Sequence, residues 1–504
     1  MCKKGLATLK NLVGGRVVQQ LSYKLKDENK NLKERVIQFG EGNFLRCFVD
    51  WQIDKMNKEL GMDMGIVVVQ TQAQGLVKLM QEQDNLYTVY LQGILNGEEI
   101  EEHDIVTSIV RSIDPFATAA DYQSYLALAD NADLQFVVSN TTEAGIYFDE
   151  TEILNDAPTV SFVGKLTALL YRRYQKFNGS KDSGLIFLPC ELIEQNGTKL
   201  RETILKYAHH WQLDPGFTTW IEDANTFCCT LVDRIVPGYP RDTIEEVTTK
   251  LGYKDNLVVV GEPFNLFAIE GPELLKTAFP ADKVGANTIV VEDLAPYRTR
   301  KVRILNGLHT AMVPIAYLLG FETVGAAVAD ETINKFIKVT TIEEIMPNID
   351  LPKDELLTFT TIVVDERFAN PFIKHYLMSI ALNAIAKYKT RDLPSVLECI
   401  DKGIIPNKLL FALAALIVFY GGKRGTETIE LVDDAEVLKF FANVWTEYAN
   451  DLDVLVEKVL QNTEFWGQDL TDVAGITTIV QGHLQLIVNE GMPFAVAKVL
   501  NNNL

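Results

Sequence analysis

The stretch that decides the fold reads Val36-Ile37-Gln38-Phe39-Gly40-Glu41-Gly42-Asn43-Phe44-Leu45. A short apolar run leads directly into two glycines one residue apart, and residues 44–57 then have helical periodicity. Glycines let a backbone approach a pyrophosphate, and a helix that begins there offers free N–H groups. Leu45 stands where such turns usually carry a third glycine. The stretch predicts a dinucleotide site, and a tight turn without a ligand is the alternative.

Further short apolar runs follow this stretch through the N-terminal half of the chain. Three of them are Ile66–Val69, Phe136–Ser139 and Leu185–Pro189. Amphipathic stretches separate these runs, a pattern typical of a parallel sheet covered by helices. Two further apolar runs, Phe227–Ile235 and Leu257–Val260, are expected to extend this domain. Residues 87–95, followed by Asn96-Gly97, predict a hairpin arm.

The character of the chain changes after about residue 285. From Tyr297 onward most segments have helical periodicity, for example 370–387 and 408–420, and prolines fall between these segments. We therefore predict an α/β domain over residues 1–285 and a mainly α-helical domain over residues 286–504.

The composition of the 504-residue chain excludes several classes of protein. Its 47 basic and 68 acidic residues give a formal net charge of −21, so neither nucleic acid nor a membrane surface is expected as a partner. The longest uncharged apolar run, 409–420, has 12 residues, whereas a membrane span needs about 20. It predicts a buried core helix. The start, Met1-Cys2-Lys3-Lys4-Gly5, leads into no apolar signal segment, so no secretory signal is expected.

Cysteine and histidine usage bears on compartment and metal binding. Six cysteines without a repeated spacing make no disulfide framework, which fits a reducing cytoplasm. The six histidines show no two-ligand helical spacing and there is no C-x-x-C, so no metal is expected. An anionic substrate would need a local cluster of Lys and Arg to overcome the acidic balance.

The ends of two predicted strands bear on cofactor binding. The second strand ends at Val69-Gln70-Thr71-Gln72, where an NAD-binding fold usually offers an acid to the ribose. Neither an acid nor an arginine stands there, so this position does not decide between NAD and NADP. A later strand runs into Asn140-Thr141-Thr142-Glu143-Ala144-Gly145, which predicts a cofactor contact at the carboxyl edge of the sheet. An ordinary polar loop is the alternative.

The densest group of chemically active residues lies between Pro296 and His309. At about 100° per residue, Arg298, His309 and Asn306 lie roughly 60°, 80° and 140° from Lys301 around a helix, so all four can share one broad face. A lysine, an amide and an imidazole there can protonate an alkoxide, polarise a carbonyl and bind sugar hydroxyls. The alternative is a basic, solvated helix start, with Asn306 as a cap and His309 packed in the core.

Lys301-x4-Asn306-x2-His309 resembles the K-x4-N-x2-H signature of the polyol-specific long-chain dehydrogenases, the mannitol dehydrogenase family. Other segments resemble more specifically the members of that family that reduce tagaturonate. These segments are 37–46, 139–146, 189–193, 231–236, 304–307 and 370–375. The resemblance is collinear from about residue 35 to near the C-terminus.

The resemblance implies a Rossmann-type N-terminal domain that binds a dinucleotide, a helical substrate-binding and catalytic domain, and an active site in the cleft between them. It implies a metal-free, NAD-dependent oxidoreductase of hexuronate catabolism that interconverts D-tagaturonate and D-altronate. Fructuronate, or a polyol such as mannitol, is the alternative substrate. A non-catalytic NAD(H)-binding sensor is the rival from another class, and the intact Lys301, Asn306 and His309 speak against it.

The resemblance also implies residue roles. Lys301 would be the general acid in reduction and the general base in oxidation, Asn306 would donate to the substrate oxygen, and His309 would hold a neighbouring hydroxyl. The cofactor-binding residues would be Phe39, Gly40, Gly42, Asn43, Phe44, Thr141 and Glu143. Candidates for binding the substrate carboxylate are Arg298, Arg303, Arg367, Lys374 and His375, with Arg367 and Lys374 as first choices. For each of these the alternative is an ordinary solvated surface charge.

One motif departs from the family pattern. Mannitol-oxidising members carry a second oxyanion-hole asparagine in a Cys-Asp/Glu-Asn motif, which reads Cys190-Glu191-Leu192 here. Either another group such as Asn196 has taken over that role, or one donor is absent. The tagaturonate-reducing members share the Cys-Glu-Leu form. The sequence leaves the oligomeric state open.

Overall fold

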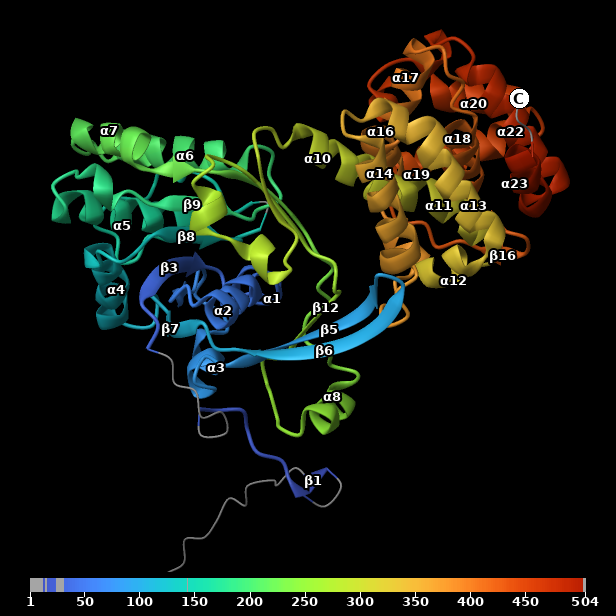
Figure 1. Cartoon of the computed structure of the whole chain (residues 1–504). Coiled ribbons are helices and arrows are strands. Elements are labelled where there is room, and N and C mark those ends of the chain that lie inside the picture. Colours follow the sequence, from blue (N-terminus) through green and yellow to red (C-terminus); the bar gives the residue numbers. More distant parts are fainter. Residues whose placement is uncertain (1–11, 14–15, 24–30, 143, 502–504) are drawn as a thin grey trace, which may run out of the picture. The chain divides into compact units, whose positions relative to one another are not determined.

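The chain forms two compact units. The computed structural model describes residues 12–13, 16–23, 31–142 and 144–501. The first unit holds the chain up to Gln92 together with Ile100–Leu294, and the second holds Gly93–Glu99 together with the chain from Ala295 onward (Figure 1).

A six-stranded parallel sheet forms the centre of the first unit. Its strand order is β10-β9-β8-β3-β4-β7, which is the order of a Rossmann fold, so the predicted fold of this domain is confirmed. The strands are β3 (Glu34–Phe39), β4 (Gly65–Val69), β7 (Ile109–Ile113), β8 (Phe136–Ser139), β9 (Ile186–Pro189) and β10 (Thr226–Phe227). The order reverses between β3 and β8, and ligands of open α/β sheets bind at such a point.

Neighbouring residues along each buried strand pack on opposite faces of this sheet. Val36 and Ile66 belong to the core on one face, and Ile37 and Val67 to the core on the other. Because both faces are buried, the strands read as unbroken apolar runs rather than as alternating ones. The α-helices of this unit are α1 (Asn43–Cys47), α2 (Val49–Leu60), α3 (Val77–Glu82), α4 (Ala119–Leu126), α5 (Phe162–Lys176), α6 (Asn196–His210), α7 (Pro215–Ala224), α8 (Ile244–Leu251) and α9 (Leu275–Ala278).

The helix predicted over residues 44–57 is two helices, so that prediction is wrong in one respect. Phe48 separates α1 from α2 with φ −125° and ψ −81°. Its ring is fully buried against Phe44 (centroids 4.9 Å apart) and Phe267 (5.4 Å). Packing of this aromatic side chain accompanies a break that helical periodicity does not reveal.

Two three-stranded sheets and one antiparallel pair, β1 (Leu12–Val13) with β2 (Arg16–Val17), also belong to the first unit. One three-stranded sheet joins β11 (Cys229–Asp233), β13 (Leu266–Glu270) and β14 (Thr288–Val291), and the other joins β12 (Val259–Gly261), β5 (Tyr87–Leu95) and β6 (Glu98–Val106). The predicted hairpin is confirmed as β5 and β6, the long blue pair in Figure 1. Asn96 and Gly97 join the strands with positive φ (+54° and +81°), as a two-residue hairpin turn of this kind requires.

The second unit is almost entirely helical, as predicted. The apolar run 409–420 forms most of α18, whose residues 408–417 are all buried, so the predicted core helix is confirmed. Three segments are π-helices, namely η4 (Lys301–Asn306), η5 (Thr341–Ile345) and η7 (Ile362–Phe368). The α-helices are α10 (Ala295–Arg300), α11 (Gly307–Leu318), α12 (Val324–Ala329), α13 (Glu331–Thr340), α14 (Lys353–Thr361), α15 (Leu377–Ile380), α16 (Ala384–Arg391), α17 (Leu393–Asp401), α18 (Asn407–Phe419), α19 (Ala435–Tyr448), α20 (Leu452–Leu460), α21 (Thr463–Trp466), α22 (Ile476–Glu490) and α23 (Met492–Asn501).

The helix predicted over residues 370–387 is wrong in its first half. Residues 370–376 form no helix, and Asn383, with φ +53°, separates α15 from α16. Pro371 disfavours a helical conformation at Asn370, which explains why no helix begins there.

Within the described ranges, no helix has the length and apolar character that crossing a bilayer requires. Nor do these ranges contain three His, Cys, Asp or Glu side chains grouped as metal ligands.

Candidate active site

The turn after β3 carries the first part of the candidate site. Gly40 has a φ of +112°, which suits glycine, and a Cβ there would lie 3.0 Å from the Asn140 carbonyl oxygen. The turn therefore lies against the end of β8, at the reversal of the strand order. A Cβ on Gly42, by contrast, would meet no atom within 4 Å. The backbone at Gly42 thus faces open space that a pyrophosphate could enter.

The carboxylate of Glu191 orders the loop after β8. It accepts hydrogen bonds from Ser139 Oγ (3.0 Å), Thr141 N (3.0 Å) and Thr141 Oγ1 (2.9 Å). Burial raises the pKa of Glu191, and these donors act in the opposite direction. Glu143 lies outside the described residues. In the Cys-Glu-Leu motif, Glu191 thus positions the loop that holds Thr141, while the Leu192 side chain is 61% exposed and offers no donor.

The side chain of Asn196 has no donor left for a substrate. Its Nδ2 donates to the carbonyl oxygens of Pro189 (2.9 Å), Glu191 (3.1 Å) and Thr230 (3.2 Å), and its Oδ1 accepts from the backbone N–H of Thr230 (2.9 Å). The residue is fully buried. The hypothesis that Asn196 supplies the missing oxyanion-hole donor is therefore wrong.

The aromatic residues predicted to contact the cofactor point in different directions. Phe39 is fully buried against Phe162 (ring centroids 4.8 Å apart), so at the turn it can offer only its backbone. Phe44 is half-buried and stacks on Phe48. Asn43 is exposed, and its Oδ1 accepts from Arg46 Nη2 (2.7 Å).

An acid does lie beside the end of β4, and the glycine turn contributes it. Glu41 Oε1 accepts from the backbone N–H of Leu76 (3.3 Å), and a Cβ on Gly75 would collide with this carboxylate. Gln70 is turned inward, because its Nε2 donates to the Gln72 carbonyl (2.9 Å). The sequence did not predict that the Glu41 carboxylate lies beside the end of β4, because Glu41 and Leu76 are far apart in the chain.

Arg46 holds the glycine turn in place from its buried side. Its side chain is buried, and it donates to the carbonyl oxygens of Leu257 and Glu41 as well as to Asn43 Oδ1. The guanidinium also lies over the Tyr87 ring, 5.1 Å from its centroid.

Replacement of Arg46 by leucine is expected to lower the free energy of unfolding by about 3 kcal/mol, because it leaves buried carbonyl oxygens without donors. The measurement is urea unfolding at neutral pH. The control is Arg172→Leu, which removes the partly exposed pair with Asp130 (2.6 Å) and is expected to cost at most about 1 kcal/mol. Equal losses in the two variants would contradict a supporting role for Arg46.

In the second unit, Lys301 and Asn306 are the first and last residues of the π-helix η4. A π-helix closes hydrogen bonds between residues five apart, and such turns are frequent at functional sites. Lys301 and Asn306 are five apart, so the separation of roughly 140° expected for an α-helix does not apply, and the two lie closer to one face. Asn306 precedes α11 without capping it, and its amide has no hydrogen-bond partner among the described residues.

Two arginines beside Lys301 are held by protein carboxylates. Arg300 is buried, pairs with Glu355 and lies over the Phe359 ring (4.4 Å). Arg303 donates from Nη1 and Nη2 to the two carboxylate oxygens of Glu398, 2.6 Å each. Arg303, a candidate for binding the substrate carboxylate, is thus occupied, and this stretch is not a solvated helix start.

His309 is buried (8% exposed) with one ring nitrogen unsatisfied. Its ring packs on Phe368 (centroids 4.1 Å apart) and on His375 (5.1 Å). Nε2 is buried and has no hydrogen-bond partner among the described residues. A buried polar atom without a partner costs about 1–3 kcal/mol, so a substrate hydroxyl is the natural partner here.

Four basic side chains, which we call the basic cluster, act electrostatically on His309. Burial, followed by the charges of His375, Arg367, Arg391 and Lys387, holds the pKa of His309 far below its usual value. The imidazole is therefore neutral, with one nitrogen as donor and the other as acceptor.

The basic cluster contains two residues that sequence reasoning found and two that it missed. Arg367, from η7, and His375 were predicted; Lys387 and Arg391, both on α16, were not. The sequence signal that could have identified Lys387 and Arg391 is their i,i+4 spacing, which places both basic side chains on one face of a helix. Of the other predicted residues, Lys374 is exposed and Arg298 is half-buried on α10.

Asp392 lies against Gly307, the first residue of α11. It is 1% exposed, neither carboxyl oxygen has a hydrogen-bond partner among the described residues, and a Cβ on Gly307 would lie 2.8 Å from Oδ1. Burial raises the pKa of Asp392 well above its usual value. The carboxyl is therefore protonated in the folded protein at pH values where the unfolded chain ionises it.

Replacement of Asp392 by asparagine is expected to make the free energy of unfolding depend less on rising pH. Above about pH 4 the unfolded wild type releases this proton and the folded protein keeps it, so the free energy of unfolding falls by up to about 1.4 kcal/mol per pH unit. Asparagine does not titrate. Unfolding curves from pH 4 to 8 should show the stability of the variant rising relative to that of the wild type, and a constant difference would contradict this assignment.

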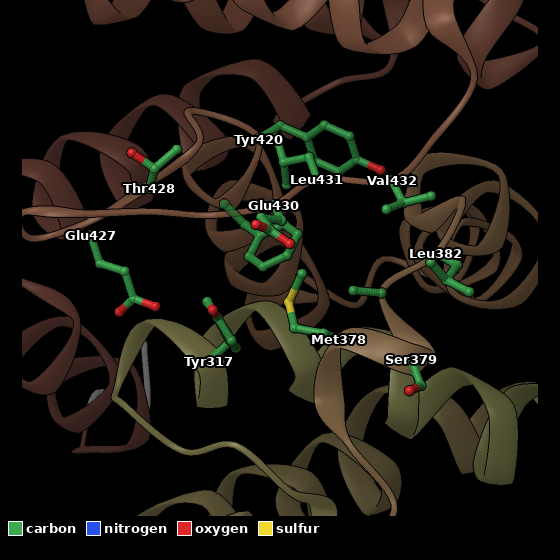
Figure 2. A pocket seen from close by; sticks show the side chains of 12 residues that line it. Tyr317, Met378, Ser379, Leu382, Tyr420, Glu427, Thr428, Glu430, Leu431 and Val432 are labelled. Atoms are coloured by element: carbon green, nitrogen blue, oxygen red, sulfur yellow. The ribbon is translucent and has the colours of Figure 1, made fainter.

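A separate pocket in the second unit has the wrong charge for an anionic substrate. It has a volume of about 520 Å³, and its lining includes Tyr317, Met378 and Tyr420. Figure 2 shows the carboxyl groups of Glu427 and Glu430 at this pocket, which contains none of Lys301, Asn306 and His309. The candidate catalytic residues on η4 and α11 therefore lie outside this pocket.

Two family models match this chain, one in its N-terminal part and one in its C-terminal part. The model of the mannitol dehydrogenase Rossmann domain matches residues 34–283, and that of the mannitol dehydrogenase C-terminal domain matches residues 293–488. The chain is 48% identical to an altronate oxidoreductase of Bacillus subtilis (strain 168), over 94% of this chain and 97% of that protein. It is 47% identical to one of Cronobacter sakazakii (strain ATCC BAA-894), over 92% and 96%.

Two solved structures share the fold. A substrate-free D-sorbitol dehydrogenase matches with a TM-score of 0.80 and 20% identity, over 95% of this chain and 100% of that one. The Pseudomonas fluorescens mannitol 2-dehydrogenase, in a ternary complex with NAD and D-mannitol, matches with a TM-score of 0.65 and 19% identity, over 94% and 95%. The chain therefore belongs to the mannitol dehydrogenase family.

Proposed function

We propose that this chain is an NAD-dependent oxidoreductase that interconverts D-tagaturonate and D-altronate in hexuronate catabolism. The name of the curated relatives, altronate oxidoreductase, supports the reaction, since 48% identity extends over 94% of the chain. The observation that carries the proposal is the unpartnered Nε2 of His309 inside the basic cluster. A buried nitrogen open to a hydroxyl, on a ring that the charges of Arg367, Arg391 and Lys387 reach, suits an anionic sugar better than an uncharged polyol.

The proposed roles follow from the chemistry of each side chain. Bound NADH supplies the hydride in reduction, and NAD⁺ accepts it in oxidation. Lys301 donates a proton to the oxygen that becomes the alkoxide, and takes it back in the reverse direction. The free amide of Asn306 donates to the same oxygen and stabilises its developing charge. His309 hydrogen-bonds a neighbouring hydroxyl through Nε2.

Cofactor binding is proposed at the edge formed by the turn after β3 and the loop after β8. Open space at Gly42 and the left-handed backbone of Gly40 fit the approach of a pyrophosphate. The other residues proposed to hold the cofactor are Phe39, Asn43, Phe44, Thr141 and Glu143. For the substrate, the residues predicted from the sequence are Arg298, Arg367, Lys374 and His375, and the position beside His309 favours Arg367 and His375.

We also propose a cytoplasmic location. The five described cysteines, Cys47, Cys190, Cys228, Cys229 and Cys399, are buried free thiols, which suits a reducing compartment. The proposed partner is a small sugar acid.

The test is NADH consumption at neutral pH with D-tagaturonate, D-fructuronate and D-fructose in parallel. We expect the highest kcat/KM with D-tagaturonate. Faster turnover of D-fructuronate or D-fructose would support the proposed oxidoreductase reaction but contradict D-tagaturonate as the preferred substrate. Binding of NADH without turnover of any of the three would favour a sensor.

A further inference from the structure

We propose that Arg391 binds the carboxylate of the sugar-acid substrate and so selects uronates over uncharged ketoses and polyols. This inference rests on the proposed function and names a residue that the sequence did not single out.

Arg391 is anchored beside the catalytic residues through a single nitrogen. Its Nη1 donates to Thr310 Oγ1 (3.1 Å) and, more weakly, to the carbonyl oxygen of Asn306 (3.5 Å). Among the described residues no partner is found for Nε or Nη2, and the side chain is half-buried. A guanidinium offers its N–H groups as a rigid fork that matches the two oxygens of a carboxylate. Arg391 therefore keeps part of that fork available after it has been positioned.

Within the described ranges no carboxylate forms a salt bridge or hydrogen bond with Arg391, and Asp392 is the one acid whose charge acts on it. The other arginines near η4 do have carboxylate partners, Arg300 with Glu355 and Arg303 with Glu398. Asp392 is the neighbour of Arg391 in the chain, but its carboxyl makes no hydrogen bond with a described residue, and burial raises its pKa well above the usual value. A half-buried cation is costly without a counterion. A carboxylate supplied by the substrate removes that cost.

The position of Arg391 fits one end of an extended sugar acid. The carbonyl of Asn306 and the hydroxyl of Thr310 hold the guanidinium on the catalytic segment, and its charge is among those that act on His309. In D-tagaturonate the keto carbon and the carboxylate lie near opposite ends of the carbon chain. Asn306 and Lys301 would act on the keto end and Arg391 on the carboxylate end. An uncharged ketose gains nothing from Arg391.

The test compares two substrates that differ only in the group Arg391 would bind. D-tagatose carries a primary alcohol where D-tagaturonate carries its carboxylate. For Arg391→Gln we expect KM for D-tagaturonate to rise by about 30-fold or more with little change in kcat, because a hydrogen-bonded charge pair is lost. The kinetic constants for D-tagatose should change less than threefold. Arg391→Lys, which keeps the charge and loses the fork, should give an intermediate KM.

Two controls separate substrate binding from a structural role. Lys389→Gln removes a positive charge from the same helix, outside the basic cluster, and should leave both substrates unaffected. Thermal unfolding should show that the Arg391 variants are folded, and Arg391→Lys serves if Arg391→Gln is not. Equal losses with both substrates, or an unchanged KM for D-tagaturonate, would overturn the role of Arg391 and leave the proposed function intact. If the wild type does not reduce D-tagaturonate, the proposed function fails first and the inference fails with it.

Discussion

Replacement of Lys301 by alanine is expected to lower kcat for D-tagaturonate by about 10³-fold while NADH still binds. General acid catalysis by a positioned side chain contributes about 10²–10⁴-fold to a rate, and alanine cannot transfer a proton. Lys301 is the first residue of the π-helix that ends at Asn306, and the neighbouring Arg300 and Arg303 are both paired with carboxylates, so neither of them can replace it. The measurement is steady-state NADH consumption, with NADH affinity determined by fluorescence.

The control for Lys301 is a lysine on the surface of the same unit. Lys335→Ala, on the exposed side of α13, should leave kcat within twofold of the wild type. Addition of a small primary amine should restore part of the activity of Lys301→Ala, because the amine can take the place of the lost ammonium group. A loss of less than tenfold for Lys301→Ala would contradict its assignment as the proton donor.

Replacement of Gly42 by valine is expected to weaken NADH binding by at least about 100-fold without lowering stability by more than about 1 kcal/mol. The protein has room for the side chain, since a Cβ on Gly42 meets no atom within 4 Å and the backbone is extended (φ −67°, ψ 167°). The same open space is where the pyrophosphate is proposed to approach the backbone, and a branched side chain would fill it. In this variant the affinity for NADH is therefore expected to fall while the free energy of unfolding stays nearly unchanged.

Gly40→Ala is the informative comparison for Gly42→Val. Gly40 has φ +112°, and its Cβ would lie 3.0 Å from the Asn140 carbonyl. An alanine there strains the backbone by about 1–3 kcal/mol, so stability and NADH affinity should fall together. If NADH affinity were unchanged in Gly42→Val, the proposed cofactor position would be wrong.

The parallel sheet was predictable because of where its strands lie. Segments such as 66–69 are buried on both faces and therefore read as unbroken apolar runs. The break at Phe48 was not predictable, because an apolar residue fits the helical pattern and the ring packs against Phe267, far along the chain. The same limit applies to residues 370–376, where local periodicity suggests a helix that the structure does not form.

The candidate site was predictable where its residues are close in sequence. Lys301, Asn306 and His309 form one local motif, whereas the π-helical turn that brings the first two together has no periodicity of its own. Lys387 and Arg391 join His309 only through the packing of α16. The pairing of Arg303 with Glu398 likewise depends on tertiary contacts, so sequence reasoning could not exclude Arg303 as a substrate ligand.

The most direct test of the account is the product formed from D-tagaturonate and NADH by the wild-type protein. We expect one molecule of D-altronate for each NADH consumed, identified by NMR, and no product without the protein. Formation of the epimer at the reduced carbon, or no consumption of NADH, would contradict the proposed reaction.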